Sequence, residues 1–239
     1  MKELRSTRRI ARAALSEIEQ APSRDATTLR RIRKAVSKSV KALPPENVLE
    51  IASQLVAEGP KWFGYELINQ HAEALASLRI EDVERLGSGN STWGQVDAFG
   101  TLIAGPVWLN RQIRDSAVAR WAGSSDFWWR RTALVATTVL NSKSRGGTGD
   151  ASRTLTIVDA LKRDQEDMVV KAVSWALRSL VQWDEHAVRV FLAENFEILH
   201  PRVRREVGNK LTSGLKNPRR NERSDALENS GCSLHRTHE

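Results

Sequence analysis

Apolar residues recur along this chain at the three- to four-residue spacing of an amphipathic helix. The clearest case places five apolar residues on one face: Leu29, Ile32, Val36, Val40 and Leu43. Arginine and lysine occupy many of the positions between them, so the rest of this segment is basic. Similar one-faced patterns run over residues 4–18 and 48–56. No alternating apolar run bounded by hairpin turn residues is found, so the pattern predicts an all-α protein.

Helix-breaking residues divide the pattern into segments of ordinary helix length. They include Pro22, Pro44–Pro45, Gly59–Pro60, 87–90, Gly105–Pro106, 123–125, 146–149 and Pro201. Short helices with one apolar face can bury it by stacking as antiparallel pairs, either in a bundle or in an α-solenoid. The pattern leaves both open, because no repeat is evident at a fixed period. From Asn217 the periodicity ends, which predicts a helical domain over residues 1–216 and a disordered basic and polar tail over 217–239.

The charge balance favours a polyanionic partner. Lysine and arginine number 37 against 29 aspartates and glutamates, which gives a net charge of +8 and a pI near 10.0. Cations that neutralise phosphates release condensed counterions and so bind nucleic acid without reading its sequence. The single cysteine, Cys232, excludes an intramolecular disulfide. No run approaches the roughly 18 apolar residues of a membrane span, and the first residues lack a secretory signal. We therefore expect a cytoplasmic protein without a membrane partner.

Trp93 and Asp97 are the first candidate pair for chemistry. They follow a Gly/Ser/Asn turn, and we expect Ser91 to cap a new helix there. Residues four apart share a helix face, so the indole and the carboxylate would lie on one side. Together they could stabilise a positive charge that develops on a sugar ring. The alternative interpretation is a half-buried tryptophan beside a solvated aspartate.

Two later segments combine aromatic and basic residues. In the segment 128–131, two tryptophans precede two arginines near the start of a predicted helix, where backbone N–H groups already favour an anion. We expect Trp128 in the core and Trp129 as a wall of the site. Lys171, Trp175 and Arg178 lie at positions i, i+4 and i+7 and form a basic and aromatic stripe. Ordinary solvated cations are the alternative in both segments.

Taken in this order, the three segments resemble the AlkD-type DNA alkylation repair glycosylases, which are built from HEAT-like helical repeats. The resemblance covers most of residues 1–215, but it is specific only in the quoted motifs. It implies an α-solenoid of antiparallel helix pairs with a concave basic groove. Site roles follow from it: Asp97 as catalytic carboxylate, Trp93 and Trp175 as aromatic walls, Arg131 as phosphate clamp, and Arg178 and Lys171 as further phosphate-binding residues.

The resemblance further implies excision of N3- or N7-alkylated purines from duplex DNA without base flipping, by a monomer that needs no cofactor and no metal. The chain departs from the family pattern at two places. Thr92 stands where relatives often have a first tryptophan, and Trp128–Trp129 adds an indole beside Arg131. Either change could alter which lesion fits. The alternative function is a noncatalytic helical scaffold that binds DNA or protein with the same groove.

Overall fold

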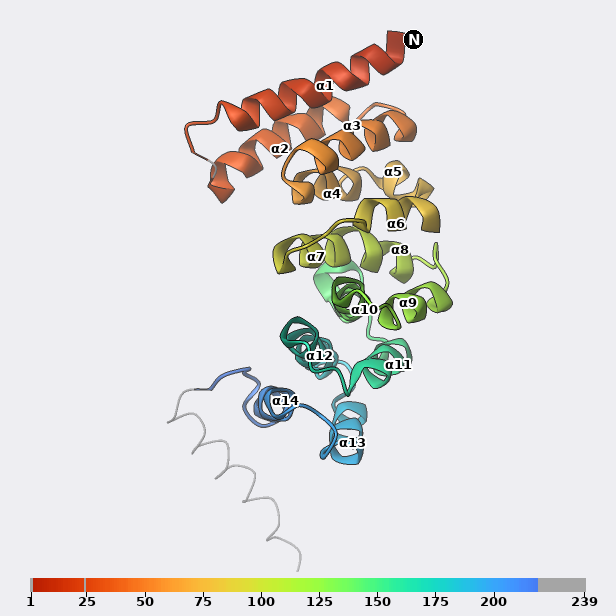
Figure 1. Cartoon of the computed structure of the whole chain (residues 1–239), viewed down its shortest axis with the longest axis vertical. Helices are drawn as coiled ribbons and strands as arrows, with labels where there is room; N and C mark the ends of the chain where they lie inside the picture. The colour runs from red at the N-terminus through yellow and green to blue at the C-terminus, as the bar shows by residue number, and fades with distance from the viewer. Residues whose placement is uncertain (1, 24, 219–239) are drawn as a thin grey trace, which may run out of the picture. The chain divides into compact units, whose positions relative to one another are not determined.

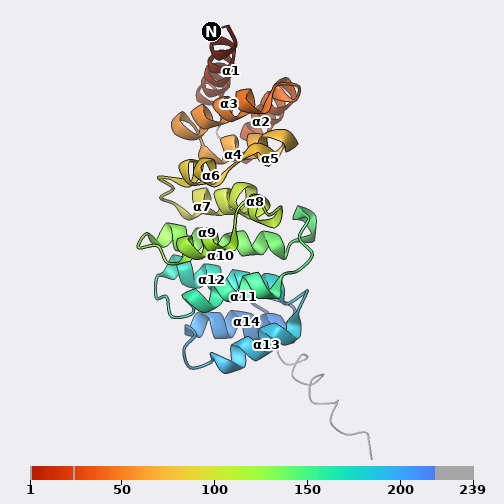
Figure 2. The ribbon, with the colours of Figure 1, turned by 90° about the vertical axis from the view of Figure 1, so that its right-hand side faces the viewer.

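The computed structural model describes residues 2–23 and 25–218, and this part of the chain is entirely helical apart from turns and loops. The chain divides into two compact units, with the boundary between Ala117 and Val118. Figure 1 shows the helices, and Figure 2 shows them from the side. The predicted all-α fold is confirmed. The predicted tail falls outside the described residues from position 219 onward.

The first unit contains eight α-helices and a short π-helical segment among its described residues. They are α1 (Lys2–Glu19), α2 (Ala26–Val40), α3 (Pro45–Glu58), α4 (Lys61–Asn69), α5 (Ala72–Ser77), α6 (Ile80–Gly87), α7 (Trp93–Phe99), η1 (Gly100–Ala104) and α8 (Gly105–Leu109). Helix α3 packs against α1 and α4, and α4 also packs against α2, α5 and α7. The contacts therefore join helices that are near neighbours in the sequence.

The apolar positions of the sequence pattern form the core of this unit. In α2, Leu29, Ile32, Val36 and Val40 are all buried, whereas the cations between them are mostly exposed. In α3 the buried residues are Val48, Ile51, Ala52, Leu55 and Val56. The predicted breakers act at the ends of these helices, since Pro45 is the first residue of α3 and Gly59 ends it.

The second unit consists of two layers of helices. Helix α9 (Asp115–Ala122) contains the boundary between the units. The elements that follow are α10 (Phe127–Leu140), η2 (Lys143–Arg145), α11 (Ala151–Leu161), α12 (Asp167–Leu180), α13 (Glu185–Glu194) and α14 (Pro201–Ser213). Helix α12 packs between α10 and α14 in one layer, while α11 and α13 form the other (Figures 1 and 2). This layered, sequential packing is that of a solenoid-like fold rather than a closed bundle.

Side-chain caps and one buried amide set the helix ends in the second unit. Asp126, Asp150 and Asp184 accept backbone N–H groups at the starts of α10, α11 and α13. Asn141 is buried and bonds to the Thr154 hydroxyl, to the Asp150 N–H and, through its carbonyl, to the Trp183 indole. The end of α10 is thereby joined to α11 and to the turn after α12.

The glycine-rich loop 146–149 has a packing role. A Cβ atom on Gly147 would lie 2.2 Å from the carbonyl oxygen of Val139, so only glycine fits there. Gly149 has a positive φ of 86° and packs against the Trp183 side chain. A side chain at either glycine would therefore collide with a neighbouring part of the second unit.

Two local predictions from the sequence were wrong. Gly105–Pro106 does not break a helix, because α7, η1 and α8 form one continuous helical run from Trp93 to Leu109. Ser91 is not the cap of α7, since the Thr92 hydroxyl accepts the Gln95 N–H at 3.3 Å. Within the described residues, no helix combines the length and apolar character needed to cross a membrane.

Candidate functional site

Trp93 and Asp97 lie one turn apart on α7 of the first unit, as the sequence predicted. Trp93 is the first residue of this helix and its side chain is 61% exposed. Asp97 is partly buried. Between them, Gly94 has open space around the position of a Cβ atom. The first turn of α7 therefore presents an accessible indole face, with the carboxylate on the same side of the helix.

The start of α7 is fixed by reciprocal capping. The Thr92 hydroxyl accepts the Gln95 N–H, and the Gln95 side chain accepts the Ser91 N–H at 3.0 Å. Thr92 is thus the capping residue of α7. These two hydrogen bonds fix the backbone under Trp93.

The helical run beyond Asp97 contains a proline, and a side chain from α4 compensates for it. An α-helical hydrogen bond to the Leu102 carbonyl would come from residue 106, but Pro106 has no N–H. The Asn69 side-chain amide donates to this carbonyl at 2.9 Å. The π-helical segment Gly100–Ala104 lies directly before the proline, and π-helical turns of this kind are frequent at functional sites.

Lys171, Trp175 and Arg178 lie along one stripe of α12 in the second unit. Lys171 is exposed, and Trp175 and Arg178 are partly exposed, whereas the neighbouring Val170, Val173 and Leu177 are buried. The predicted separation between the apolar face and the basic and aromatic stripe is therefore present. An indole with a cation four residues before it and another three residues after it can contact a nucleic-acid backbone or base.

A buried glutamate from α14 fixes Arg178. Glu206 is 5% exposed and accepts the Ser174 hydroxyl at 2.6 Å. The same hydroxyl accepts Nε of Arg178 at 3.1 Å, and Lys216 Nζ lies 3.4 Å from the glutamate. Burial lowers the pKa of the Arg178 guanidinium, and the Glu206 carboxylate opposes this change. Arg178 is therefore held in one orientation rather than being freely solvated.

Asp167, at the start of α12, holds two cations. One of its carboxylate oxygens lies 2.6 Å from Nζ of Lys171, and the other lies 2.5 Å from a guanidinium nitrogen of Arg202 on α14. The hydrogen bond from Lys171 is the main cause that lowers the pKa of Asp167, and Arg202 adds to it. Asp167 is therefore ionised at neutral pH.

The two arginines of α10 differ in their surroundings. Arg131 is only 5% exposed, and its guanidinium donates to the backbone carbonyl of Met168, next to the start of α12. Arg130 forms an ion pair with Asp164 at 2.6 Å and donates to the carbonyls of Ser124 and Ser125. Arg130 therefore ties the start of α10 to the turn before α12.

The tryptophans before these arginines are half-buried. Trp129 packs against Trp121 with ring centroids 5.3 Å apart, and Trp128 packs against Phe127 at 4.4 Å. Trp128 is thus less deeply buried than the sequence interpretation expected.

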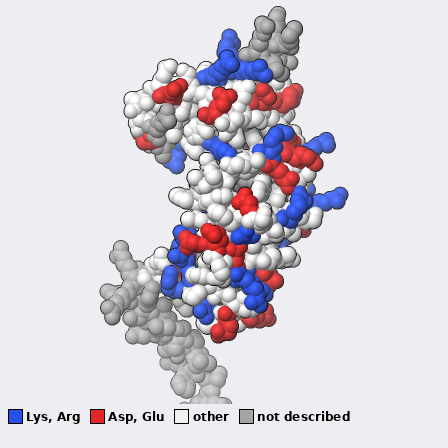
Figure 3. All heavy atoms as spheres, viewed as in Figure 1, with Lys and Arg blue, Asp and Glu red and all other residues white. Residues whose placement is uncertain are grey.

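On the face that Figure 3 shows, Lys and Arg side chains are interspersed with Asp and Glu side chains.

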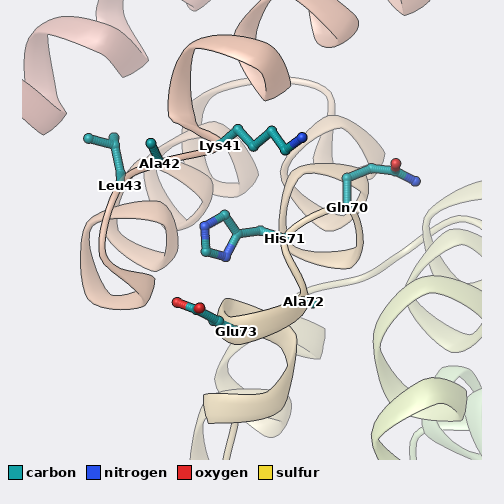
Figure 4. A pocket seen from close by; sticks show the side chains of 7 residues that line it. All are labelled: Lys41, Ala42, Leu43, Gln70, His71, Ala72 and Glu73. Carbon is teal, nitrogen blue, oxygen red and sulfur yellow. The ribbon is translucent and has the colours of Figure 1, made fainter.

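A separate pocket of about 370 Å³ lies in the first unit, between the end of α2 and the connection from α4 to α5 (Figure 4). Its lining includes Lys41, His71 and Glu73, so a cation, an imidazole and a carboxylate face the same space. Nδ1 of His71 accepts the Ala74 N–H at 3.1 Å and caps α5. The predicted site residues do not line this pocket.

The structure thus groups the six predicted site residues by unit. Trp93 and Asp97 share α7 in the first, while Lys171, Trp175 and Arg178 share α12 in the second, where Arg131 contacts the Met168 carbonyl. Sequence reasoning missed Asp167 and Glu206. Asp167 lies four residues before Lys171, a spacing that signals an ion pair. Glu206 is 32 residues from Ser174, and no local signal connects them.

Comparisons with known proteins identify the family. A family model described as DNA alkylation repair enzyme matches residues 24–211. A search of curated proteins found no match. The family match spans both units and includes all six predicted site residues.

Proposed function

Because the chain belongs to the DNA alkylation repair enzyme family, we propose that it is a DNA glycosylase that removes positively charged N3- or N7-alkylated purines from duplex DNA without flipping the base. The observation that carries the proposal is the exposed Trp93 indole on the same helical face as Asp97. Exposure gives the indole access to DNA, and the carboxylate supplies the charge that the reaction needs.

Alkylation at N3 or N7 puts a positive charge on the purine, so the base is already a good leaving group. When the glycosidic bond breaks, its electron pair goes to the purine, which departs neutral, and the deoxyribose acquires oxocarbenium character. Water then adds to C1′ and loses a proton, which leaves an abasic site. The barrier lies in the cationic sugar, and this is where an enzyme can act.

Asp97 is the proposed catalytic carboxylate. An ionised aspartate stabilises the cationic sugar by charge and orients the attacking water. Trp93 is the proposed aromatic wall beside it, with a cation–π attraction of roughly 0.5–2 kcal/mol. Trp175 is proposed as a second wall for the same reason, since α12 leaves its indole partly exposed between Lys171 and Arg178.

Arg178, Arg131 and Lys171 are the proposed contacts with the DNA backbone. The guanidinium groups of Arg178 and Arg131 donate hydrogen bonds to the Ser174 hydroxyl and the Met168 carbonyl. Because these bonds already order the side chains, less entropy is lost when a guanidinium binds a phosphate. Lys171 is more exposed, and among the described residues it pairs with the exposed Asp167 carboxylate. Such contacts hold the duplex without reading its sequence, as a protein that searches for damage requires.

The test is release of 7-methylguanine and 3-methyladenine from methylated duplex DNA by the wild type and by Asp97→Asn. We expect the variant to bind duplex DNA as the wild type does and to excise at least tenfold more slowly, since a lost 1.4 kcal/mol of transition-state stabilisation is one factor of ten. Asp159→Asn is the matched control, because this aspartate is on α11, is 57% exposed and pairs only with Lys162 in the described contacts.

Excision by Asp97→Asn at the wild-type rate would refute the catalytic role. If the wild type binds duplex DNA but releases no base from any cationic purine lesion, the noncatalytic DNA-binding scaffold is the correct function.

A further inference from the structure

Asp167 is held by two cations, Lys171 and Arg202, in the way that these side chains could hold a phosphate. The carboxylate uses one oxygen for the Lys171 ammonium and the other for the Arg202 guanidinium, at 2.6 and 2.5 Å. The side chains of Asp167, Lys171 and Arg202 are 54%, 43% and 32% exposed, so an anion from solution can reach them. Two cations from different helices are thus already gathered around one anionic group.

This anionic group lies on the stripe of α12 that carries the proposed DNA contacts. Asp167, Lys171, Trp175 and Arg178 follow at positions i, i+4, i+8 and i+11, which place them on one helix face. A duplex that approaches Trp175 along this stripe brings its phosphates toward Asp167. The carboxylate repels a phosphate and neutralises the cations that would attract it.

We propose that Asp167 is a competing carboxylate, which occupies Lys171 and Arg202 in the DNA-free protein and is replaced there by a DNA phosphate on binding. The inference rests on the proposed function, because it assumes that α12 meets duplex DNA. Its consequence is weaker binding to undamaged DNA, since each encounter must break two ion pairs and leave Asp167 beside a phosphate. Weak nonspecific binding lets a repair protein leave intact sites quickly.

The experiment measures the affinity of the full chain for an undamaged duplex at several salt concentrations, for the wild type, Asp167→Asn and Asp159→Asn. The Asp167→Asn substitution removes the charge at nearly constant size on an exposed position. The control removes the same charge from an aspartate of similar exposure, 57%, whose lysine partner lies next to α11 in the other layer. Both variants raise the net charge by one, so the difference between them reports position and not total charge.

We expect Asp167→Asn to bind the duplex about twofold to thirtyfold more tightly, the range set by two exposed ion pairs. The salt dependence should steepen by about one ion, because the complex no longer holds an unpaired carboxylate that recruits a cation. Asp159→Asn should change the affinity by less than about twofold. Adding Lys171→Ala to Asp167→Asn should remove most of the gain.

The proposed competition would be overturned if Asp167→Asn bound the duplex no more tightly than the wild type. An equal gain in affinity in Asp159→Asn would overturn it as well. If this occurs while the wild type still binds DNA and releases alkylated base, the proposed glycosylase function stands and only this inference fails. If the wild type does not bind duplex DNA at all, both fail.

Discussion

The helical run that carries Trp93 and Asp97 should depend on one side-chain amide from a neighbouring helix. Pro106 cannot supply the N–H that an α-helix would direct to the Leu102 carbonyl. The Asn69 amide on α4 supplies a donor at 2.9 Å in a partly buried position. Asn69→Ala removes this donor, so the Leu102 carbonyl loses the hydrogen bond.

The expected destabilisation is about 1–3 kcal/mol, the usual penalty for removing one partner of a buried polar group. The proline provides an internal check. Pro106→Ala restores an N–H at the right position, so in that background the carbonyl no longer needs Asn69. There, Asn69→Ala should lower the free energy of unfolding by less than about 1 kcal/mol, and the two substitutions should couple.

Urea unfolding of the four proteins in this cycle gives the free energies. Amide hydrogen exchange of residues 93–109 shows whether the loss is local to α7, η1 and α8. An equal cost of Asn69→Ala in both backgrounds would show that the amide stabilises the chain by some other contact. A cost below about 0.5 kcal/mol in the wild-type background would refute the reasoning altogether.

The remaining predictions separate function from stability. Trp93→Ala should lower excision about twofold to thirtyfold, the range set by its cation–π attraction. It should change the free energy of unfolding by less than about 0.5 kcal/mol, because Trp93 is 61% exposed. A large loss of stability would assign it to the core. Tyr65→Phe should destabilise the chain by about 1–2 kcal/mol, because the hydroxyl lies 2.9 Å from the Leu86 carbonyl oxygen and 3.1 Å from the Asn90 side-chain oxygen. Burial raises the pKa of Tyr65 to about 12. The unfolded tyrosine ionises first, near pH 10, so this contribution is complete below that pH and is lost as the pH rises toward 12. Between about pH 10 and 12, the free energy of unfolding of the wild type should therefore fall more steeply with pH than that of Tyr65→Phe. Equal slopes for the two proteins would contradict the assignment.

Much of the fold was predictable because helix formation and amphipathic packing are read from local spacing. Leu29, Ile32, Val36 and Val40 are buried as their spacing required, and the cations between them are mostly exposed. Arg33 is the exception, since it pairs with Glu66 of α4 at 2.7 Å. Trp93 and Asp97 could be placed on one helix face for the same reason. The stripe of Lys171, Trp175 and Arg178 likewise follows from the helical period alone.

Errors arose where a local rule met a tertiary contact. Gly105–Pro106 is a strong breaking signal, but Asn69 satisfies a carbonyl beside the proline and the helical run continues. The helical period likewise does not reveal that Arg131, expected as a phosphate clamp, is buried with its guanidinium against the Met168 carbonyl. The sequence contains these residues but not the distances between them.

The sequence by itself therefore determined the helical class, the apolar faces and the residue types available for chemistry, since each depends on neighbours within about four positions. Tertiary structure decided which of these charged groups are held by partners elsewhere in the chain. Asp167 joins Lys171 to Arg202, and Glu206 reaches Ser174 across 32 residues. Ion pairs and buried hydrogen bonds form between atoms that packing brings within about 3 or 4 Å, and that proximity is a property of the folded chain.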